Sequence, residues 1–158
     1  MTREHLFRGF HPDENGTTII TLNEIQIKGE WIKGDLIENQ GDYYIYHANS
    51  GDTWIRVCYD NEIVVRGYKV IPETVGEFIG KTDKNGKKIF EDDIVTIITS
   101  NNYGNINGFT GIVVYNDCGF ELLNIEDTEC LECIWYKNSE LEVIGNIHDN
   151  PELLEDVE

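Results

Sequence analysis

The sequence predicts a mainly β protein, and three features of its pattern lead to that prediction. Apolar and polar residues alternate over short stretches, which is the period expected when one face of a sheet is buried. These stretches favour Ile, Val, Tyr, Trp, Phe and Thr, which suit a pleated surface. Turn-forming residues separate them at short intervals. With 158 residues, of which 40% are hydrophobic, the chain can bury a core without a metal or disulfides.

Predicted strands run through most of the chain. Residues 17–28, TTIITLNEIQIK, partly alternate from Ile19 onward and predict strand structure. Further strands are predicted at residues 30–37, 42–47, 54–58, 62–71, 88–98, 110–115, 133–136 and 141–147. Turns are predicted between them, at residues 14–16, 40–42, 49–52, 84–86 and 116–119. Strands punctuated at this spacing favour a β-sandwich or barrel.

Helix signals are confined to the C-terminal end. Residues 150–155 read NPELLE, in which Asn150 can cap a helix and Pro151 can occupy its first position. The sequence therefore predicts a short helical turn here.

Two segments share a pattern that suggests two small units. Residues 29–37 and 86–95 both run from a glycine through a large apolar residue and a polar turn to an Asp followed by two aliphatic residues. Asp35 and Asp93 can accept hydrogen bonds from nearby backbone N–H groups and fix the entry into a strand. The pattern predicts two interlocked β subdomains, residues 1–74 and 75–150, followed by an acidic tail at residues 151–158.

Residues 75–95, VGEFIGKTDKNGKKIFEDDIV, resemble the signature of the YopX-like family of phage and prophage proteins, which runs roughly V-G-x-x-x-G-x-x-D-x-N-G-x-x-I-[FY]-E-x-D-I-V. Matching stretches continue in order at residues 7–9, 29–37, 70–76 and 143–154. The resemblance implies a small β-rich phage protein whose second part is similar to an SH3-like barrel, with no established activity. The matching motif positions are interpreted as structural: Gly80, Asp83, Asn85, Gly86, Ile89, Asp93, Ile94 and Val95.

Two details of this motif carry separate expectations. Residues 83–86, DKNG, predict a hairpin corner with Asn85 and Gly86 at positive φ, because the spacing to Gly86 is too short for a calcium loop. Asp92 occupies the position of the pattern's usual glycine, which speaks against a positive-φ requirement there.

The charge of the chain narrows the class of partner. Asp and Glu number 30 and Lys and Arg 12, so the net charge is −18, which disfavours nucleic acid and anionic membranes. From residue 117 to 158 there are 13 acidic residues and one basic residue, Lys137. This asymmetry fits either binding to a cationic host protein or a solvated acidic face.

One polar segment is the predicted binding loop. Residues 100–108, SNNYGNING, are rich in Asn and Gly and show no periodicity. The candidate protein-binding residues in this loop are Asn101, Asn102, Tyr103, Asn105 and Asn107. Together with the acidic C-terminal quarter, the loop is the predicted interaction surface.

Three other patterns give weaker functional hypotheses. Cys130 and Cys133 have the spacing of half a zinc site, but a second pair is missing, and no metal or cofactor is predicted. The residues 91–93, EDD, are the candidates for a metal-dependent hydrolase, although neighbouring strand residues point to opposite faces. Aromatic residues of the first half suit either sheet packing or stacking on single-stranded nucleic acid: Trp31, Tyr43, Tyr44, Tyr46, Trp54, Tyr59 and Tyr68.

The resulting prediction is a nonenzymatic phage or prophage accessory protein that acts by protein binding. We expect it in the bacterial cytoplasm, because the chain lacks an export signal and any stretch of about 20 apolar residues, and the four cysteines are expected as thiols. We also expect a homo-oligomer formed through exposed β edges, and no membrane partner. A weak single-stranded nucleic-acid-binding barrel and a metal-dependent hydrolase are the alternatives.

Overall fold

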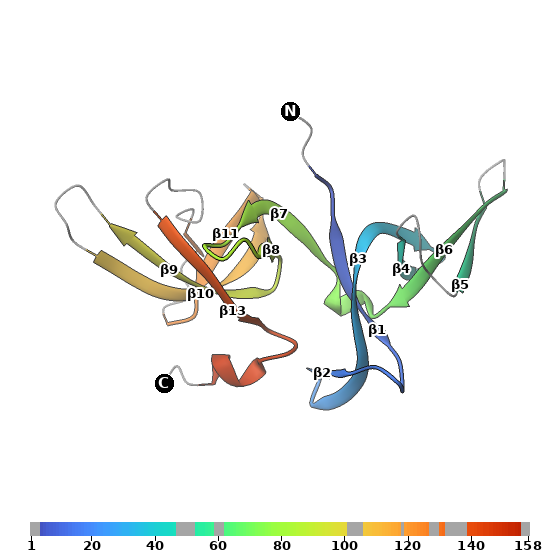
Figure 1. The fold of residues 1–158 in the computed structure, drawn as a ribbon, viewed down its shortest axis with the longest axis horizontal. Coiled ribbons are helices and arrows are strands. Elements are labelled where there is room, and N and C mark those ends of the chain that lie inside the picture. Colours follow the sequence, from blue (N-terminus) through green and yellow to red (C-terminus); the bar gives the residue numbers. More distant parts are fainter. Residues whose placement is uncertain are drawn as a thin grey trace. The chain divides into compact units, whose positions relative to one another are not determined.

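Two compact units make up the chain in the computed structural model, Met1–Phe78 (unit 1) and Ile79–Glu158 (unit 2) (Figure 1). The structure describes residues 4–46, 53–58, 62–100, 106–117, 119–126, 130–131 and 139–155. Strands dominate both units, which confirms the predicted mainly β fold class. The boundary expected from the sequence, after residue 74, lies four residues before the division between the units.

Unit 1 is built on antiparallel strand pairs. Its strands are β1 (Phe7–Pro12), β2 (Thr18–Leu22), β3 (Ile25–Asn39), β4 (Asp42–Tyr46), β5 (Thr53–Cys58), β6 (Glu62–Val70) and the first part of β7 (Gly76–Thr82). They follow the order β5-β6-β4-β3-β1-β7, and β2 pairs with β3 beside this path. A single 3-10 turn, η1 (Pro72–Thr74), precedes β7. Strand β7 begins in unit 1, and its residues after Phe78 belong to unit 2.

The stretch predicted as strand at residues 17–28 is a hairpin, which corrects that prediction. Asn23 and Glu24 form its turn with φ angles of 49° and 65°. Two consecutive residues at positive φ are typical of the type I′ turn that joins strands through two residues. Gln40 and Gly41, with φ of 53° and 85°, make the corresponding turn between β3 and β4, where the sequence predicts one.

The interior of unit 1 contains apolar residues from several strands. Phe10, Ile20, Ile45 and Val70 are at most 1% exposed. The rings of Phe10 and Trp31, which are register partners in β1 and β3, meet edge to face at 5.4 Å between centroids. Strand β3 can lie this close to β1 because it has a glycine at residue 29, where a Cβ would come within 2.1 Å of the His11 carbonyl oxygen.

Unit 2 is an antiparallel sheet in the order β12-β11-β10-β9-β13. The strands of this sheet are β9 (Asp93–Ser100), β10 (Ile106–Asn116), β11 (Gly119–Asn124), β12 (Cys130–Leu131) and β13 (Ser139–Asn146), and the unit also contains β8 (Lys88–Phe90), which pairs with β7. Strands β9 to β12 follow one another as a meander, and β13 returns to pair with β9. A 3-10 turn, η3 (Pro151–Leu154), then confirms the predicted short helical segment.

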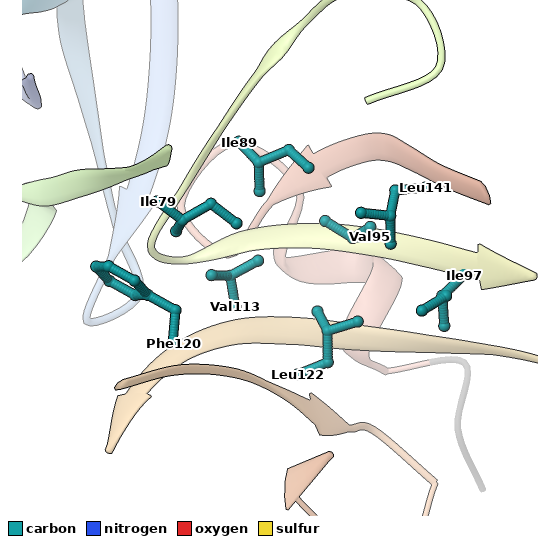
Figure 2. Packing of buried hydrophobic residues seen from close by; sticks show 8 residues of the cluster. All are labelled: Ile79, Ile89, Val95, Ile97, Val113, Phe120, Leu122 and Leu141. Carbon is teal, nitrogen blue, oxygen red and sulfur yellow. The ribbon is translucent and has the colours of Figure 1, made fainter. Parts of the chain in front are cut away.

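The core of unit 2 is one cluster of aliphatic side chains and a phenylalanine (Figure 2). Alternate residues of each strand point into it, as β11 shows, where Phe120 and Leu122 are buried and their neighbours are less so. A fully buried side chain of this kind stabilises a fold by about 1.5–3 kcal/mol. The members are Ile79, Ile89, Val95, Ile97, Val113, Phe120, Leu122 and Leu141.

Candidate functional site

The motif residue Asp83 closes the hairpin between β7 and β8. Its Oδ1 accepts the backbone N–H groups of Asn85 and Lys87, both at 2.9 Å, and its own carbonyl accepts the N–H of Gly86 at 3.0 Å. Gly86 has a φ of 79°, whereas Asn85 is not at positive φ, which corrects the expectation for Asn85. A type I turn followed by a glycine in the left-handed region explains this arrangement.

Asp83 also reaches a strand that lies 60 residues away in sequence. Its Oδ2 accepts the backbone N–H of Val143 in β13 at 3.1 Å. Burial raises the pKa of the Asp83 carboxyl, but the hydrogen bonds from Val143, Lys87 and Asn85 together bring this pKa below its ordinary value. The motif aspartate therefore holds the hairpin and the edge of β13 together as a carboxylate.

A similar four-residue pattern forms a related turn in unit 1, in which the glycine, Gly16, is not at positive φ. Residues 13–16 read DENG, and residues 83–86 read DKNG. Asp13 Oδ1 accepts the N–H of Asn15 at 2.9 Å, and the Asp13 carbonyl accepts the N–H of Gly16 at 3.0 Å. The two turns share the hydrogen bonds to the aspartate, whereas only the turn at residues 83–86 has its glycine in the left-handed region.

Lys84 covers the outer edge of β13. Its backbone N–H donates to the carbonyl of Leu141 at 2.9 Å, and its Nζ lies 2.8 Å from Glu142 Oε2 and 3.5 Å from Glu140 Oε1. The hydrogen bond to Glu142 is the main reason that the pKa of Lys84 is raised. This segment of the sheet edge is occupied by the chain's own hairpin.

A surface depression of about 400 Å³ lies beside this contact. Burial lowers the pKa of Lys81, one of the side chains around it. Of the other charged residues that line it, Lys84 and Glu140 are paired with each other, and Asp83 accepts backbone N–H groups. The residues that line the depression are Lys81, Thr82, Asp83, Lys84, Ser139, Glu140 and Leu141.

The second half of the motif makes a tight entry into β9. Asp93 is 1% exposed, and its Oδ2 accepts the N–H of Phe90 at 2.8 Å. Asp92 has a φ of 66°, so the position does adopt the left-handed conformation that the family's glycine favours. The expectation from the aspartate was therefore wrong, because aspartate is among the few non-glycine residues that tolerate this region.

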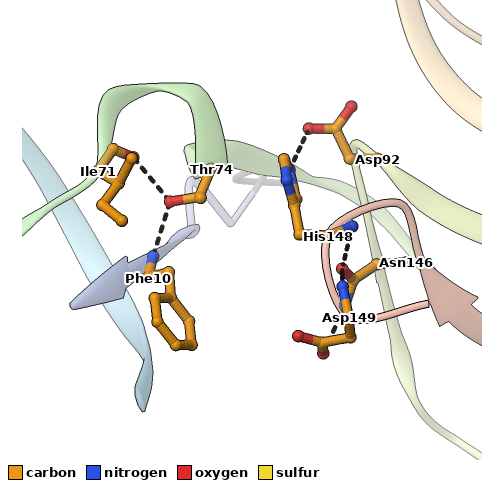
Figure 3. A network of polar contacts seen from close by, with 7 residues as sticks. All are labelled: Phe10, Ile71, Thr74, Asp92, Asn146, His148 and Asp149. Carbon is orange, nitrogen blue, oxygen red and sulfur yellow. Dashed lines mark hydrogen bonds and ion pairs between the residues drawn. The ribbon is translucent and has the colours of Figure 1, made fainter. Parts of the chain in front are cut away.

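Asp92 meets the C-terminal motif at His148 (Figure 3). His148 is 5% exposed, and its Nε2 lies 3.3 Å from Asp92 Oδ2. Asn146 Oδ1 accepts the N–H groups of His148 and Asp149, each at 2.9 Å, and the N–H of Ile147 donates to the Asp92 carbonyl at 3.0 Å. Two family motifs that are distant in sequence meet in this polar cluster.

A smaller polar contact orders the end of unit 1, and Figure 3 also shows it. Thr74 is 1% exposed. Its Oγ1 accepts the N–H of Phe10 at 2.8 Å and donates to the carbonyl of Ile71 at 2.7 Å. One hydroxyl therefore connects the turn η1 to β1.

The acidic residues 91–93 do not converge on one point. Asp92 faces His148, and Asp93 binds the backbone of Phe90. Within the described residues, no group of three or more His, Cys, Asp or Glu side chains has the arrangement that could hold a metal ion.

Several predicted site residues lie outside the described residues. These include Asn101, Asn102, Tyr103 and Asn105 of the predicted loop, as well as Cys133. Asn107 lies in β10 and Cys130 in β12. The remaining motif residues have defined places: Ile89, Ile94 and Val95 are fully buried, and Gly80 has a φ of 90°.

The aromatic residues of the first half are placed only in part. Trp31 packs against Phe10 and lies beneath the Arg8 guanidinium, at 5.0 Å from the ring centroid. Tyr68 contacts the ring of His11. Tyr43, Tyr44 and Tyr46 are half-buried in β4, while Tyr59 and the Trp54 side chain lie outside the described part.

Unit 2 has a long stretch of sequence without basic residues. Between Ile89 and Tyr136 the sequence contains nine Asp and Glu and no Lys or Arg, a signal that a charge count over the C-terminal quarter alone does not reveal. At the β10–β11 corner, a hollow of about 370 Å³ is lined by Tyr115, Asn116, Asp117 and Glu121. Tyr115 is 64% exposed, and the sequence analysis did not single it out.

Comparison with known proteins gives a family and a similar solved structure. The family model described as YopX protein matches residues 6–155. A crystal structure of protein EF1440 from Enterococcus faecalis is similar over 97% of this chain and 99% of that chain, with 21% sequence identity and a TM-score of 0.49. A search among curated proteins finds no match.

Among the described residues, none of the helices has the length and apolar character that crossing a bilayer requires.

Proposed function

The chain belongs to the YopX protein family, and from this premise we propose that it is a phage or prophage accessory protein that acts without catalysis, by binding a cationic host protein. The proposal places it in the cytoplasm of the bacterial host. It also includes self-association of the chain through a strand edge. We further propose that unit 2 is an SH3-like barrel, which its β9–β10–β11 meander supports.

The observation that carries the proposal is the uneven distribution of charge. Unit 2 contains 17 Asp and Glu against five Lys, whereas unit 1 contains 13 Asp and Glu against seven Lys and Arg. A surface of one sign raises the association rate of an oppositely charged partner and disfavours partners of its own sign. We therefore propose that the partner binds unit 2.

Exposure of the carboxylates supports this assignment. Asp117, Glu126, Glu140, Glu152 and Glu155 are exposed residues of unit 2. They come from the β10–β11 corner, the end of β11, the edge strand β13 and the C-terminal turn. Exposed carboxylates thus lie on several elements of this unit, and the pair between Glu140 and Lys84 is itself exposed.

A capture experiment with matched variants tests the proposal. The full chain, tagged and immobilised, is incubated with lysate of the bacterial host and eluted along a salt gradient. We expect a basic protein to elute at moderate salt, and its recovery to fall in the variant Glu126→Gln/Glu140→Gln/Glu155→Gln. The matched control is Glu14→Gln/Glu30→Gln/Glu38→Gln, which neutralises three exposed carboxylates of unit 1.

Two outcomes contradict the proposal. One is recovery of the tagged chain alone at low salt. The other is equal loss of the captured protein in both variants, because net charge rather than the surface of unit 2 then determines binding. Retention of the chain on immobilised single-stranded DNA, released by salt, would instead favour nucleic-acid binding.

A further inference from the structure

An open strand edge lies in unit 1 along β2. Among the described strands, β2 pairs with β3 alone. The two-residue turn makes Leu22 and Ile25 a hydrogen-bonded pair, so alternation directs the backbone N–H and C=O groups of Ile19 and Thr21 away from β3. These four groups form an edge that a further strand can extend.

Within the part of the chain that the structure describes, this edge lacks the devices that normally prevent strand addition. Charged residues, proline, bulges or a covering segment protect most edge strands. Strand β2 reads TIITL and contains neither charge nor proline, and Ile19 is 53% exposed. The edge strand β13, by contrast, carries Glu140 and Glu142, has an irregular register after Val143, and is covered by the hairpin at residues 83–87.

We infer that β2 pairs with β2 of a second copy of this chain, antiparallel about a twofold axis at Ile20. This inference rests on the self-association included in the proposed function, and it specifies which strand edge forms the contact. In this register Ile19 of each copy lies opposite Thr21 of the other. Each of these two pairs forms two N–H···O bonds between the outward backbone groups, which gives four bonds in total. On the other face, Ile20 is already buried within unit 1, so the contact joins the two strands mainly through these backbone bonds.

Charge favours a second copy as the occupant of this edge. Two chains of net charge −18 repel one another, so a contact between them requires a surface without acidic residues. Strand β2 has no acidic residue. In the pairing of β2 with β3, Ile19 lies opposite Lys28, which is a cation. A twofold contact also places the same patch on both sides, which the uncharged sequence TIITL allows.

Sedimentation equilibrium of the full chain tests the inference. We expect a dimer whose association constant rises with salt, because screening weakens the repulsion between the copies. Ile19→Lys places a charge on the pairing strand and is expected to lower the association constant by about tenfold or more, equivalent to about 1.4 kcal/mol. The matched control is Ile98→Lys, at another exposed strand isoleucine, which is 46% exposed and lies in unit 2. It is expected to change the constant by less than about twofold.

A second variant tests the backbone bonds directly. Thr21→Pro removes an N–H that points to the open edge and is not used in the ladder with β3, so it is expected to abolish the dimer. A chain that stays monomeric in high salt, or Ile19→Lys with unchanged association, overturns the inference. Its failure is distinguishable from failure of host-protein capture, because salt strengthens the first contact and weakens the second.

Discussion

At the scale of single residues, one buried hydroxyl gives a sharp test of the structure. Thr74→Val keeps the shape of the side chain but leaves the Phe10 N–H without its acceptor in a buried place. We expect a loss of about 1–3 kcal/mol in the free energy of unfolding, measured by urea denaturation. Thr74→Ser keeps the hydroxyl and is expected to cost only about 0.8 kcal/mol for the lost methyl. Equal losses in the two variants would contradict the role of the hydroxyl.

Asp83 predicts a specific dependence of stability on pH. Its pKa is lowered in the folded chain, so its contribution is present above the unfolded pKa of about 3.9 and is lost as the pH falls through the folded pKa. Asp83→Asn cannot accept all three N–H groups and is expected to cost about 1–3 kcal/mol at pH 7. Urea denaturation from about pH 7 to pH 3 should show wild type and variant converging on the acidic side. Parallel curves would contradict this assignment.

Turns formed by neighbouring residues could be predicted from the sequence, whereas contacts with residues distant in sequence could not. The turn at residues 83–86 follows from Asp, Asn and Gly at fixed offsets, because that chemistry is local. The bond from Val143 to Asp83 and the contact between His148 and Asp92 span about 60 residues, and no spacing rule reports them. The positive φ of Asp92 was not predicted, because aspartate tolerates this conformation without requiring it, and its contacts with distant residues hold it there.

At the scale of elements, the β2–β3 hairpin offers a gain in stability. Glu24 holds a φ of 65°, a conformation that costs an L-residue about 1–2 kcal/mol and that glycine adopts freely. Glu24→Gly is expected to raise the free energy of unfolding by about 0.5 kcal/mol after the added entropy of the unfolded chain. Glu30→Gly, in the middle of β3, is the control and is expected to lower it by about 0.5–1 kcal/mol. Thermal or urea unfolding that ranks the two variants the other way would contradict the turn.

Most strands could be predicted because alternation is a property of each strand alone. The hairpin at Asn23 and Glu24 was missed since neither residue is a glycine, and the apolar pattern continues through the turn. Strand β9 begins at Asp93 rather than within one long strand at residues 88–98, because the Asp92 conformation interrupts the extended chain. Strand order, such as the return of β13 to β9, depends on contacts that single-strand patterns do not encode.

At the scale of the whole molecule, a net charge of −18 implies that salt stabilises the folded state. Like charges repel most strongly when the chain is compact, and screening reduces that cost. Raising NaCl from about 0.02 M to 0.5 M is expected to raise the Tm by roughly 2–4 °C, measured by calorimetry. The variant Glu126→Gln/Glu140→Gln/Glu155→Gln should gain less from the same change. A Tm that falls with salt would show that attractive ion pairs dominate instead.

The two turns with the sequence Asp-x-Asn-Gly, at residues 13–16 and 83–86, also affect the rate at which their asparagines deamidate. Asparagine followed by glycine deamidates when the glycine backbone nitrogen attacks the asparagine side chain. In both turns that nitrogen already donates its hydrogen to an aspartate carbonyl, at 3.0 Å, and the turn holds it in place. The folded chain therefore protects Asn15 and Asn85 from conversion to aspartate. Each molecule that has lost ammonia at one of these positions records a period during which that turn was open.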